Sequence, residues 1–117
     1  MSTNKVEFES LAEFWPFYLS EHTKPQNRML HFVGTSGALL LIITAIFKRK
    51  PILLLPAIIC GYGFSWIGHF FIEKNKPAAF KYPVKSFISD LKMFTHILRG
   101  TMYKEIAKAD IYVSRIE

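Results

Sequence analysis

The chain has 117 residues, which is enough for one domain. Half of the residues are apolar, and the mean hydropathy of +0.19 is high for a small soluble protein in which 21% of residues are charged. The net charge of +6 is compatible with anionic lipid or nucleic acid as a partner. The single cysteine, Cys60, excludes both a disulfide within the chain and a cysteine-based metal site.

The first predicted element is an amphipathic helix over residues 7–20. Apolar side chains recur there at helical spacing, and three glutamates lie near its start, where the helix dipole favours acids. Pro16 lies within this pattern and predicts a kink or a split. The segment HTKPQN then ends the helix, because a residue that precedes proline is biased away from helical geometry.

Two apolar blocks follow, and neither contains Asp, Glu, Lys or Arg. They cover residues 29–47 and 51–72, and each is close to the roughly 20 residues that a helix needs to cross the hydrocarbon core of a bilayer. A pair of buried core helices is the alternative. A soluble chain of this size has too little other sequence to cover two helices that are apolar all round. The sequence therefore predicts two membrane spans.

Only the letters KRK separate the two blocks, so the predicted spans form an antiparallel hairpin. Counting outward from Arg49 gives small residues at matching depths on the two helices: Gly34 opposite Ser65, and Ala38 opposite Gly61. Small residues at such positions let membrane helices approach closely. Packing alone accounts for these residues, and we assign them no chemistry.

A second amphipathic helix is predicted over residues 84–99. It carries too many charges to span a bilayer, and fits a helix that lies on the membrane surface or across the open end of the hairpin. The tail from Thr101 is mixed in character and predicts at most a short helix. The distribution of lysine and arginine favours cytoplasmic termini. The predicted fold class is all-α: one domain over residues 1–117, an integral membrane hairpin of two spans with amphipathic helices on one side.

All four histidines fall at the open end of the predicted hairpin. His31 and His69 lie at nearly equal distances from Arg49 along the chain, so both imidazoles are expected at almost the same depth. His22 precedes the first span on that side, and His96 lies on the second amphipathic helix. Imidazoles gathered at a membrane boundary suit a transition metal such as iron, zinc or copper.

Glu73 stands four residues after His69 and shares its helix face if the helix continues. It could complete a two-histidine, one-carboxylate iron site, or orient a ligating histidine. The alternative is that the histidines are ordinary side chains at a membrane boundary, grouped by the hairpin alone. Spacing leaves both interpretations open, although polar groups at membrane depth favour function.

The sequence gives little indication of other kinds of catalysis or of nucleotide binding. Asp90 and Glu105 show no pairing in the sequence that indicates acid–base catalysis, and no nucleophile elbow or phosphate-binding glycine motif occurs. The lysines flank the predicted spans, which fits lipid headgroups better than nucleic acid.

Two ordered motifs resemble those of a known family. The segment FYLSEHTKPQNRMLHFVGT is similar to a tyrosine–His–x-x-Pro-x-Asn–His pattern, and GHFFIEKNKPAAF is similar to a Gly-His-x-x-x-Glu-Lys-x-x-Pro-Ala pattern. On these motifs the chain is identified as a member of the Mpo1-like family, over residues 14–100. The characterised eukaryotic members are Fe(II)-dependent 2-hydroxy fatty acid dioxygenases of the endoplasmic reticulum. They carry further membrane helices where this chain has the KRK turn.

The resemblance implies α-oxidation, in which a 2-hydroxy fatty acid and O2 give an acid one carbon shorter. Fe(2+) is the implied cofactor, membrane lipids are the surroundings, and no nucleic acid partner is expected. The motif residues implied to hold iron are His22, His31 and His69, and Glu73 and Asn27 are the implied catalytic residues, with Pro77 in support. The implied location is the endoplasmic reticulum for a eukaryotic chain and the inner membrane for a bacterial one.

Three cations near the predicted spans, Lys24, Arg28 and Lys74, are candidates to pair with a fatty acid carboxylate. Two other functions stay open beside the dioxygenase. One is a non-enzymatic membrane hairpin that acts as a scaffold, with incidental histidines. The other is a metal-dependent lipid enzyme of different chemistry, such as a hydroxylase or a hydrolase. Metal content separates the scaffold from the dioxygenase, and product analysis separates the enzymes.

Overall fold

The computed structural model describes residues 10–116, and every regular element within that range is helical. The α-helices are α1 (Leu11–Ser20), α2 (Pro25–Phe47), α3 (Leu54–Ile67), α4 (Pro83–Arg99) and α5 (Met102–Ile116). Short 3₁₀ turns cover Pro51–Leu53 and Ala78–Phe80, and a π-helical turn, Gly68–Glu73, continues α3. The predicted all-α fold class is confirmed for the described residues.

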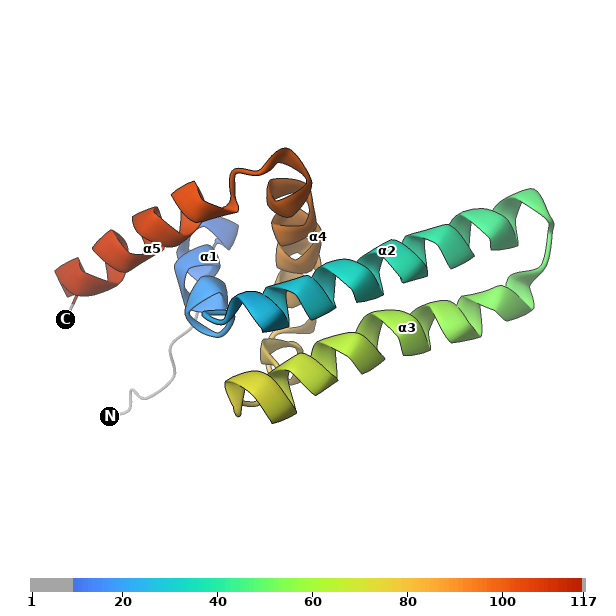
Figure 1. Ribbon diagram of the computed structural model, residues 1–117, viewed down its shortest axis with the longest axis horizontal. Coiled ribbons are helices and arrows are strands. Elements are labelled where there is room, and N and C mark those ends of the chain that lie inside the picture. Colours follow the sequence, from blue (N-terminus) through green and yellow to red (C-terminus); the bar gives the residue numbers. More distant parts are fainter. Residues whose placement is uncertain (1–9, 117) are drawn as a thin grey trace.

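Helices α2 and α3 form a long antiparallel hairpin that projects from the rest of the molecule (Figure 1). Gly34 brings the two helices into close contact. A Cβ added at Gly34 would lie 2.9 Å from the backbone oxygen of Cys60 and 2.9 Å from Cβ of Phe64. A backbone oxygen cannot move aside without shifting the helix, so α2 needs glycine here. The close approach of the two helices is confirmed at Gly34, although the nearest atoms belong to Cys60 and Phe64 and not to the predicted Ser65.

The two arms of the hairpin are long and apolar enough to cross a membrane. The candidate segments are Pro25–Phe47 and Pro51–Glu73, with hydropathies of 2.0 and 1.6, and only 17% of each is buried within the molecule. Large apolar side chains on the outer faces are open, among them Leu40 at 67% and Phe47 at 82% exposed. The first arm begins earlier than the predicted residue 29, because Pro25 starts a helix readily at its first position.

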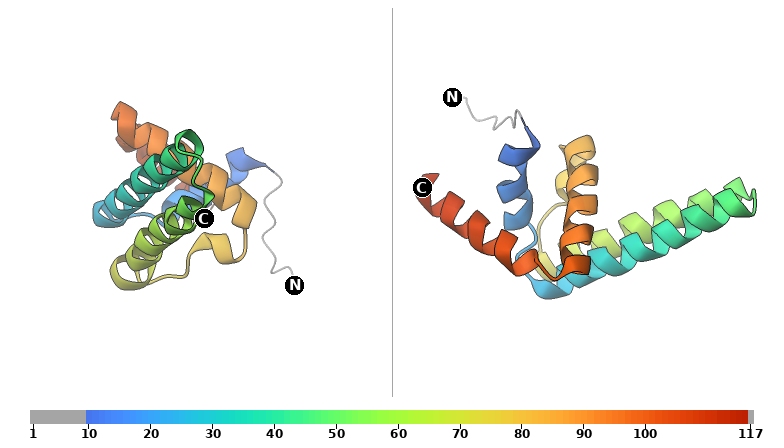
Figure 2. Two further views of the ribbon diagram at one scale, coloured as in Figure 1. Left: turned by 90° about the vertical axis from the view of Figure 1, so that its right-hand side faces the viewer. Right: turned by 90° about the horizontal axis from the view of Figure 1, so that it is seen from above.

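The other three helices pack around the open end of the hairpin, and Figure 2 shows the hairpin projecting away from them. Helix α1 begins at Leu11 with Ser10 as its N-cap, whose hydroxyl accepts a hydrogen bond from the backbone N–H of Glu13 at 3.2 Å. The predicted start at residue 7 lies outside the described residues. The helix runs through Pro16 without splitting. Its buried face carries the core residues Phe14, Trp15, Tyr18 and Leu19.

Helix α4 matches the predicted amphipathic helix and is capped by Gly100, whose φ of 71° is the left-handed conformation common after a helix. The helix in the C-terminal tail is longer than predicted, since α5 has 15 residues. It docks on α1 through buried Met102 and Ala109, and the indole N–H of Trp15 donates to Oε1 of Glu105 at 3.0 Å. The C-terminal helix therefore belongs to the same core as α1.

Candidate metal centre

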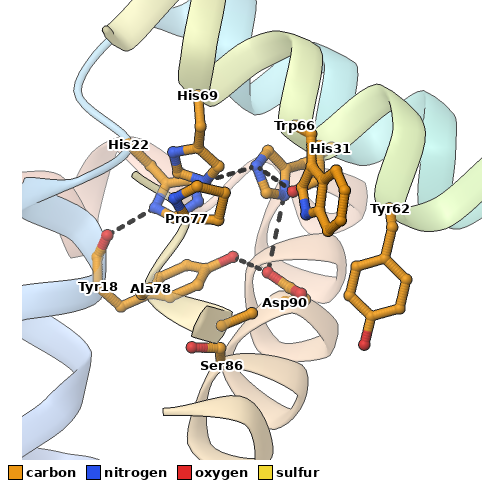
Figure 3. A pocket seen from close by; sticks show the side chains of 12 residues that line it. Tyr18, His22, His31, Tyr62, Trp66, His69, Pro77, Ala78, Ser86 and Asp90 are labelled. Carbon is orange, nitrogen blue, oxygen red and sulfur yellow. Dashed lines mark hydrogen bonds and ion pairs between the residues drawn. The ribbon is translucent and has the colours of Figure 1, made fainter. Parts of the chain in front are cut away.

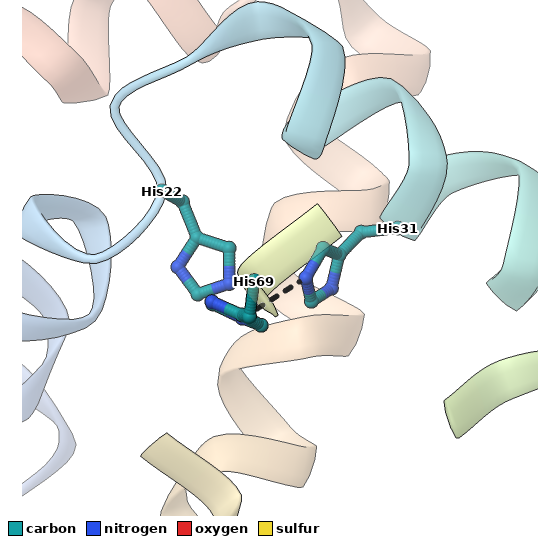
Figure 4. A group of neighbouring side chains, drawn as sticks. All are labelled: His22, His31 and His69. Carbon is teal, nitrogen blue, oxygen red and sulfur yellow. Dashed lines mark hydrogen bonds between the residues drawn. The ribbon is translucent and has the colours of Figure 1, made fainter. Parts of the chain in front are cut away.

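Three histidines from separate parts of the chain meet where the hairpin joins α1 and α4 (Figure 4). His22 comes from the loop between α1 and α2, His31 from α2, and His69 from the π-helical turn. One ring nitrogen from each lies within 4.8 Å of those of the other two. The side chains are 1%, 5% and 2% exposed, respectively. The depth match predicted for His31 and His69 therefore brings the two rings into contact.

The ring of His22 is fixed by its own segment of chain. Its Nδ1 lies 2.6 Å from the carbonyl oxygen of Tyr18, to which it donates, and the imidazole stacks on the Tyr18 ring. Burial, together with the neighbouring imidazoles of His31 and His69, holds the pKa of His22 well below its usual value. His22 is therefore neutral at neutral pH. Its buried Nε2 has no hydrogen-bond partner among the described residues, which leaves a lone pair available for a metal.

The ring of His69 is oriented by Asn75, which the sequence analysis missed. Lys74 adopts a left-handed conformation, with φ of 60°, and turns the chain back so that the backbone N–H of Asn75 donates to the carbonyl of His69 at 2.9 Å. The Asn75 amide nitrogen donates to the carbonyl of Glu21, so its Oδ1 faces Nδ1 of His69 at 2.7 Å. This acceptor places the His69 proton on Nδ1 and the lone pair on Nε2.

The third ring, His31, lies between the other two imidazoles and α4 (Figure 3). Its Nδ1 is 3.7 Å from Oδ1 of Asp90, and the hydroxyl of Tyr18 donates to the same carboxylate oxygen. Its Nε2 is 3.2 Å from both Nε2 of His69 and Oγ of Ser65. Burial raises the pKa of Asp90 to about 7, against the opposing effect of the Tyr18 hydrogen bond. Asp90 thus stands in the position from which a carboxyl group orients a ligating histidine.

The arrangement fits a transition metal ion. His22 and His69 hydrogen-bond through Nδ1 to an oxygen atom, Nδ1 of His31 lies 3.7 Å from the Asp90 carboxylate, and one ring nitrogen of each histidine lies within 4.8 Å of those of the other two. Lone pairs of His31 and His69 facing each other at 3.2 Å repel unless a proton or a cation lies between them. Two nitrogens that are each roughly 2.1 Å from a shared ion lie about 3.0–3.4 Å apart, which matches this spacing. Imidazole ligands suit iron, zinc and copper.

A small cavity lies beside the three rings and is also lined by Tyr18, Ser86 and Asp90 (Figure 3). Its volume of about 10 Å³ corresponds to about one water molecule. The hydroxyl of Ser86 is buried and has no hydrogen-bond partner in the described part of the chain. The cavity therefore has room and polar groups for one small ligand next to the imidazoles.

The sequence that forms this site matches a known protein family. A family described as 2-hydroxy-palmitic acid dioxygenase Mpo1-like matches residues 8–102. The chain belongs to the Mpo1-like family. The family suspected from the two sequence motifs is confirmed, and the matched range contains all three clustered histidines. Searches of curated proteins and of solved structures gave no match.

In this Mpo1-like chain, the motif acid Glu73 hydrogen-bonds to the residues that precede α2. Its two carboxylate oxygens accept hydrogen bonds from the backbone N–H of Lys24 at 3.0 and 3.2 Å, and from the hydroxyl of Thr23 at 3.0 Å. A carboxylate is stabilised at a helix N-terminus by the unpaired N–H groups and by the helix dipole. Glu73 is not among the three residues whose ligand atoms converge. Its observed contacts tie the two ends of the histidine-bearing hairpin together.

The motif asparagine, Asn27, is fully buried against the residue that precedes His69. A Cβ added at Gly68 would lie 1.8 Å from Oδ1 of Asn27, so the motif glycine is required by this contact. Neither side-chain polar atom of Asn27 has a hydrogen-bond partner among the described residues. Pro77 is buried and lines the small cavity beside the rings. Both residues therefore adjoin the metal centre.

The structure separates His96 from the other three histidines. Its Nδ1 pairs with the hydroxyl of Thr101 at 2.7 Å, its Nε2 lies 3.8 Å from Oε1 of Glu105, and its ring lies beside Trp15. His96 follows Asp90 by six positions, which at ~100° per residue is a rotation of ~240° around α4. It therefore contacts α1 and α5, whereas Asp90 faces the metal centre.

The cations proposed for a carboxylate have different environments. The guanidinium of Arg28 donates to the carbonyls of His22 and Thr23, at 2.7 and 2.9 Å, and so stabilises the loop that carries the first imidazole. Lys24 and Lys74 have exposed side chains. The observed role of Arg28 is structural.

Proposed function

We propose that the chain is an iron-dependent dioxygenase that shortens 2-hydroxy fatty acids by one carbon. The observation that carries the proposal is that three buried histidines bring one ring nitrogen each within 4.8 Å of one another, while Nδ1 of His22 and of His69 is held by a hydrogen bond to an oxygen atom. Family membership adds the substrate class, since the family is described by a 2-hydroxy-palmitic acid dioxygenase. A scaffold function gives no reason for three buried imidazoles that meet at one place.

His22, His31 and His69 would hold the iron. When bound, Fe(2+) supplies the redox chemistry with O2. The overall conversion needs no further reductant: RCH(OH)COOH and O2 give RCOOH, CO2 and H2O. The bond between the carboxyl carbon and its neighbour breaks, and that neighbour becomes the new carboxyl carbon.

The remaining residues at the centre position the reactants. Ser65 has its hydroxyl 3.2 Å from Nε2 of His31, where it can hydrogen-bond to a polar group bound beside that ring. Asp90 and Tyr18 hold the opposite side of the same imidazole. Because the three imidazoles are buried, bulk water has little access to the reaction.

We further propose that α2 and the segment Pro51–Glu73 span a bilayer, with the metal centre at one boundary and both termini on that side. The low burial and high hydropathy of both arms support this placement. A boundary site suits a fatty acid, because its polar end reaches the metal while its tail stays in hydrocarbon. The side of the termini is expected to be cytoplasmic, at the endoplasmic reticulum or at a bacterial inner membrane.

The test compares wild type with His69→Ala and with His96→Ala, which removes a histidine outside the group. Each protein is purified in detergent, loaded with Fe(2+) without oxygen, desalted, and analysed for iron and for conversion of 2-hydroxypalmitate under air. We expect bound iron, oxygen uptake and pentadecanoic acid from wild type and from His96→Ala, and none of these from His69→Ala.

Wild type without bound iron would remove the metal enzyme and favour a scaffold. Wild type that binds iron but gives a product of unchanged chain length would indicate a different lipid chemistry.

A further inference from the structure

A second cavity, of about 310 Å³, lies between α2 and α3 and is bounded by α4 at one end. We call it the hairpin groove. Its lining on α2 recurs every three or four residues: His31, Thr35, Ala38, Leu39 and Ile42. Its lining on α3 runs at the same spacing from Leu54 to Ser65. Two helical stripes thus face one another along the hairpin.

The hairpin groove is polar at one end and apolar at the other. His31, Ser65 and Asp90 are at the end near α4, while aliphatic residues such as Ile42 and Leu54 line the end nearer the KRK turn. Four residues of the groove, His31, Tyr62, Ser65 and Asp90, also line the small cavity beside the imidazoles. The groove therefore adjoins the small cavity at the candidate metal centre.

Small residues on α3 keep the groove open. A Cβ added at Gly61 would meet only Cβ of Ala38, at 3.7 Å, which is an ordinary contact. Gly34, in contrast, has no room for a Cβ. Helix contact thus requires glycine at position 34 and does not require it at position 61. The small size of Gly61 leaves space in the groove.

We propose that the hairpin groove binds the hydrocarbon chain of a fatty acid, with the polar end of the acid at His31, Ser65 and Asp90 and the methyl end near Ile42 and Leu54. The identity of the amphiphile as a fatty acid rests on the proposed function. The groove and its polarity do not depend on that function.

The length of the groove indicates the length of the chain that it holds. From His31 to Ile42, helix α2 rises roughly 16 Å at ~1.5 Å per residue. A fully extended chain advances roughly 1.2 Å per bond, a third of the ~3.5 Å that one extended residue spans. The groove therefore holds roughly 13 bonds of an extended chain. Ile42 and Leu54, at its far end, become the residues that limit chain length.

Photolabelling tests the direction of the bound chain without relying on catalysis. The full-length protein in detergent is mixed with palmitic acid that carries a diazirine near either its carboxyl end or its methyl end, and labelled residues are found by mass spectrometry. We expect the first reagent to label the region of Ser65 and the second to label Ile42 and Leu54. Equal labelling of Ile43 and Ile59, which lie outside the groove, would indicate an ordinary lipid annulus and overturn the proposal.

Two matched pairs of variants test whether residues of the groove limit the length of the bound chain. Ile42→Trp and Ile58→Trp place bulk in the groove, whereas Ile43→Trp and Ile59→Trp place it on faces outside the groove. Ile58 and Ile59 are 58% and 63% exposed, so the pair differs mainly in direction. Loss of contact with about two methylenes weakens binding roughly tenfold.

We expect 2-hydroxypalmitate to bind roughly tenfold more weakly to Ile42→Trp and Ile58→Trp than to wild type. Binding of 2-hydroxydecanoate should change little. The iron content should be unchanged in all four proteins. Equal effects within each pair would overturn the groove as the chain-binding site. Ordered labelling in a wild type that produces no shortened acid would overturn the dioxygenase and keep the groove. Turnover without ordered labelling would overturn the groove as the chain-binding site and keep the dioxygenase.

Discussion

Asn75 and His69 are joined twice: the backbone N–H of Asn75 donates to the carbonyl of His69 at 2.9 Å, and its amide oxygen faces Nδ1 of the imidazole at 2.7 Å. The left-handed turn at Lys74 makes this double contact possible, because it reverses the chain directly after the π-helical segment. One short turn thus fixes both the position and the tautomer of one imidazole of the candidate metal centre.

This contact predicts that Asn75 governs metal affinity. Asn75→Ala removes the acceptor from Nδ1 of His69, and loss of such a partner typically lowers metal affinity about 10–100-fold. Asn75→Asp keeps an acceptor and should retain most of the affinity. Competition with a chelator measures both values, with Lys76→Ala, a change at a nearby exposed residue, as the control. Equal affinities for Asn75→Ala and wild type would contradict the assigned role.

Metal removal is expected to destabilise the fold. An ion held by His22, His31 and His69 ties together the α1–α2 loop, α2 and the π-helical turn, and binding to the folded state alone adds about 2.7 kcal/mol at about 100 times Kd. A chelator should therefore lower the thermal midpoint of wild type and of His96→Ala. Alanine at any of the three clustered positions should remove this response to chelator. A response that survives in His69→Ala would place the ion elsewhere.

Two glycines of the hairpin, Gly34 and Gly61, should respond in opposite directions to alanine. Gly34→Ala forces a Cβ against the Cys60 backbone, and overpacking of this kind costs about 1–3 kcal/mol. Gly61→Ala meets only an ordinary contact and gains about 0.5–1 kcal/mol from the lower flexibility of the unfolded chain. Thermal unfolding in one detergent compares the two. Equal destabilisation would mean that both positions are closed by helix contact.

The attachment of α5 is expected to weaken in acid. Loss of hydration acts to raise the pKa of Glu105, but hydrogen bonds from Trp15 and Lys108 and the neighbouring His96 outweigh it, so the pKa is lowered. A carboxyl group with a lowered folded-state pKa stabilises the fold above its ordinary value of 4.5, and this contribution is lost as pH falls below that value.

Glu105→Gln should therefore be less stable than wild type at neutral pH, and the difference should shrink as the pH falls below the ordinary glutamate value. Unfolding followed by tryptophan fluorescence at several pH values measures this difference. Lys108→Ala, which removes the exposed partner of Glu105, serves as the matched control and should have a smaller effect. A difference that stays constant with pH would contradict the lowered pKa.

Much of the hairpin could be predicted from the sequence, because apolar blocks of membrane length joined by three charged residues leave few alternatives. Counting from Arg49 was sufficient to bring His31 and His69 together, since helix rise fixes depth. Depth along a helix does not fix the direction in which a side chain points. His96 therefore appeared equivalent to the other three histidines in the sequence, although it lies on a different face of α4 from Asp90, which faces them. The sequence also underestimated α5, whose burial against α1 supplies what its mixed composition does not indicate.

The roles of Glu73, Asn75 and Asp90 could not be assigned from spacing. Glu73 accepts hydrogen bonds from the backbone N–H of Lys24 and the hydroxyl of Thr23, in a segment far away in the chain, and Asp90 reaches His31 only because α4 crosses the hairpin. One feature of the sequence does indicate Asn75: it is an amide residue in a short loop directly after a helix end that carries a histidine. Such a residue is well placed to accept a hydrogen bond from that imidazole.

The connection between α2 and α3 lies at the opposite end of the hairpin from the three imidazoles. Extra residues inserted there, beyond the groove, would lengthen both arms by ~5.4 Å for every added turn and leave the ligand spacing untouched. The same architecture could thus be fitted to bilayers of different thickness, or accept whole additional helices at its closed end, without any redesign of the chemistry at its open end.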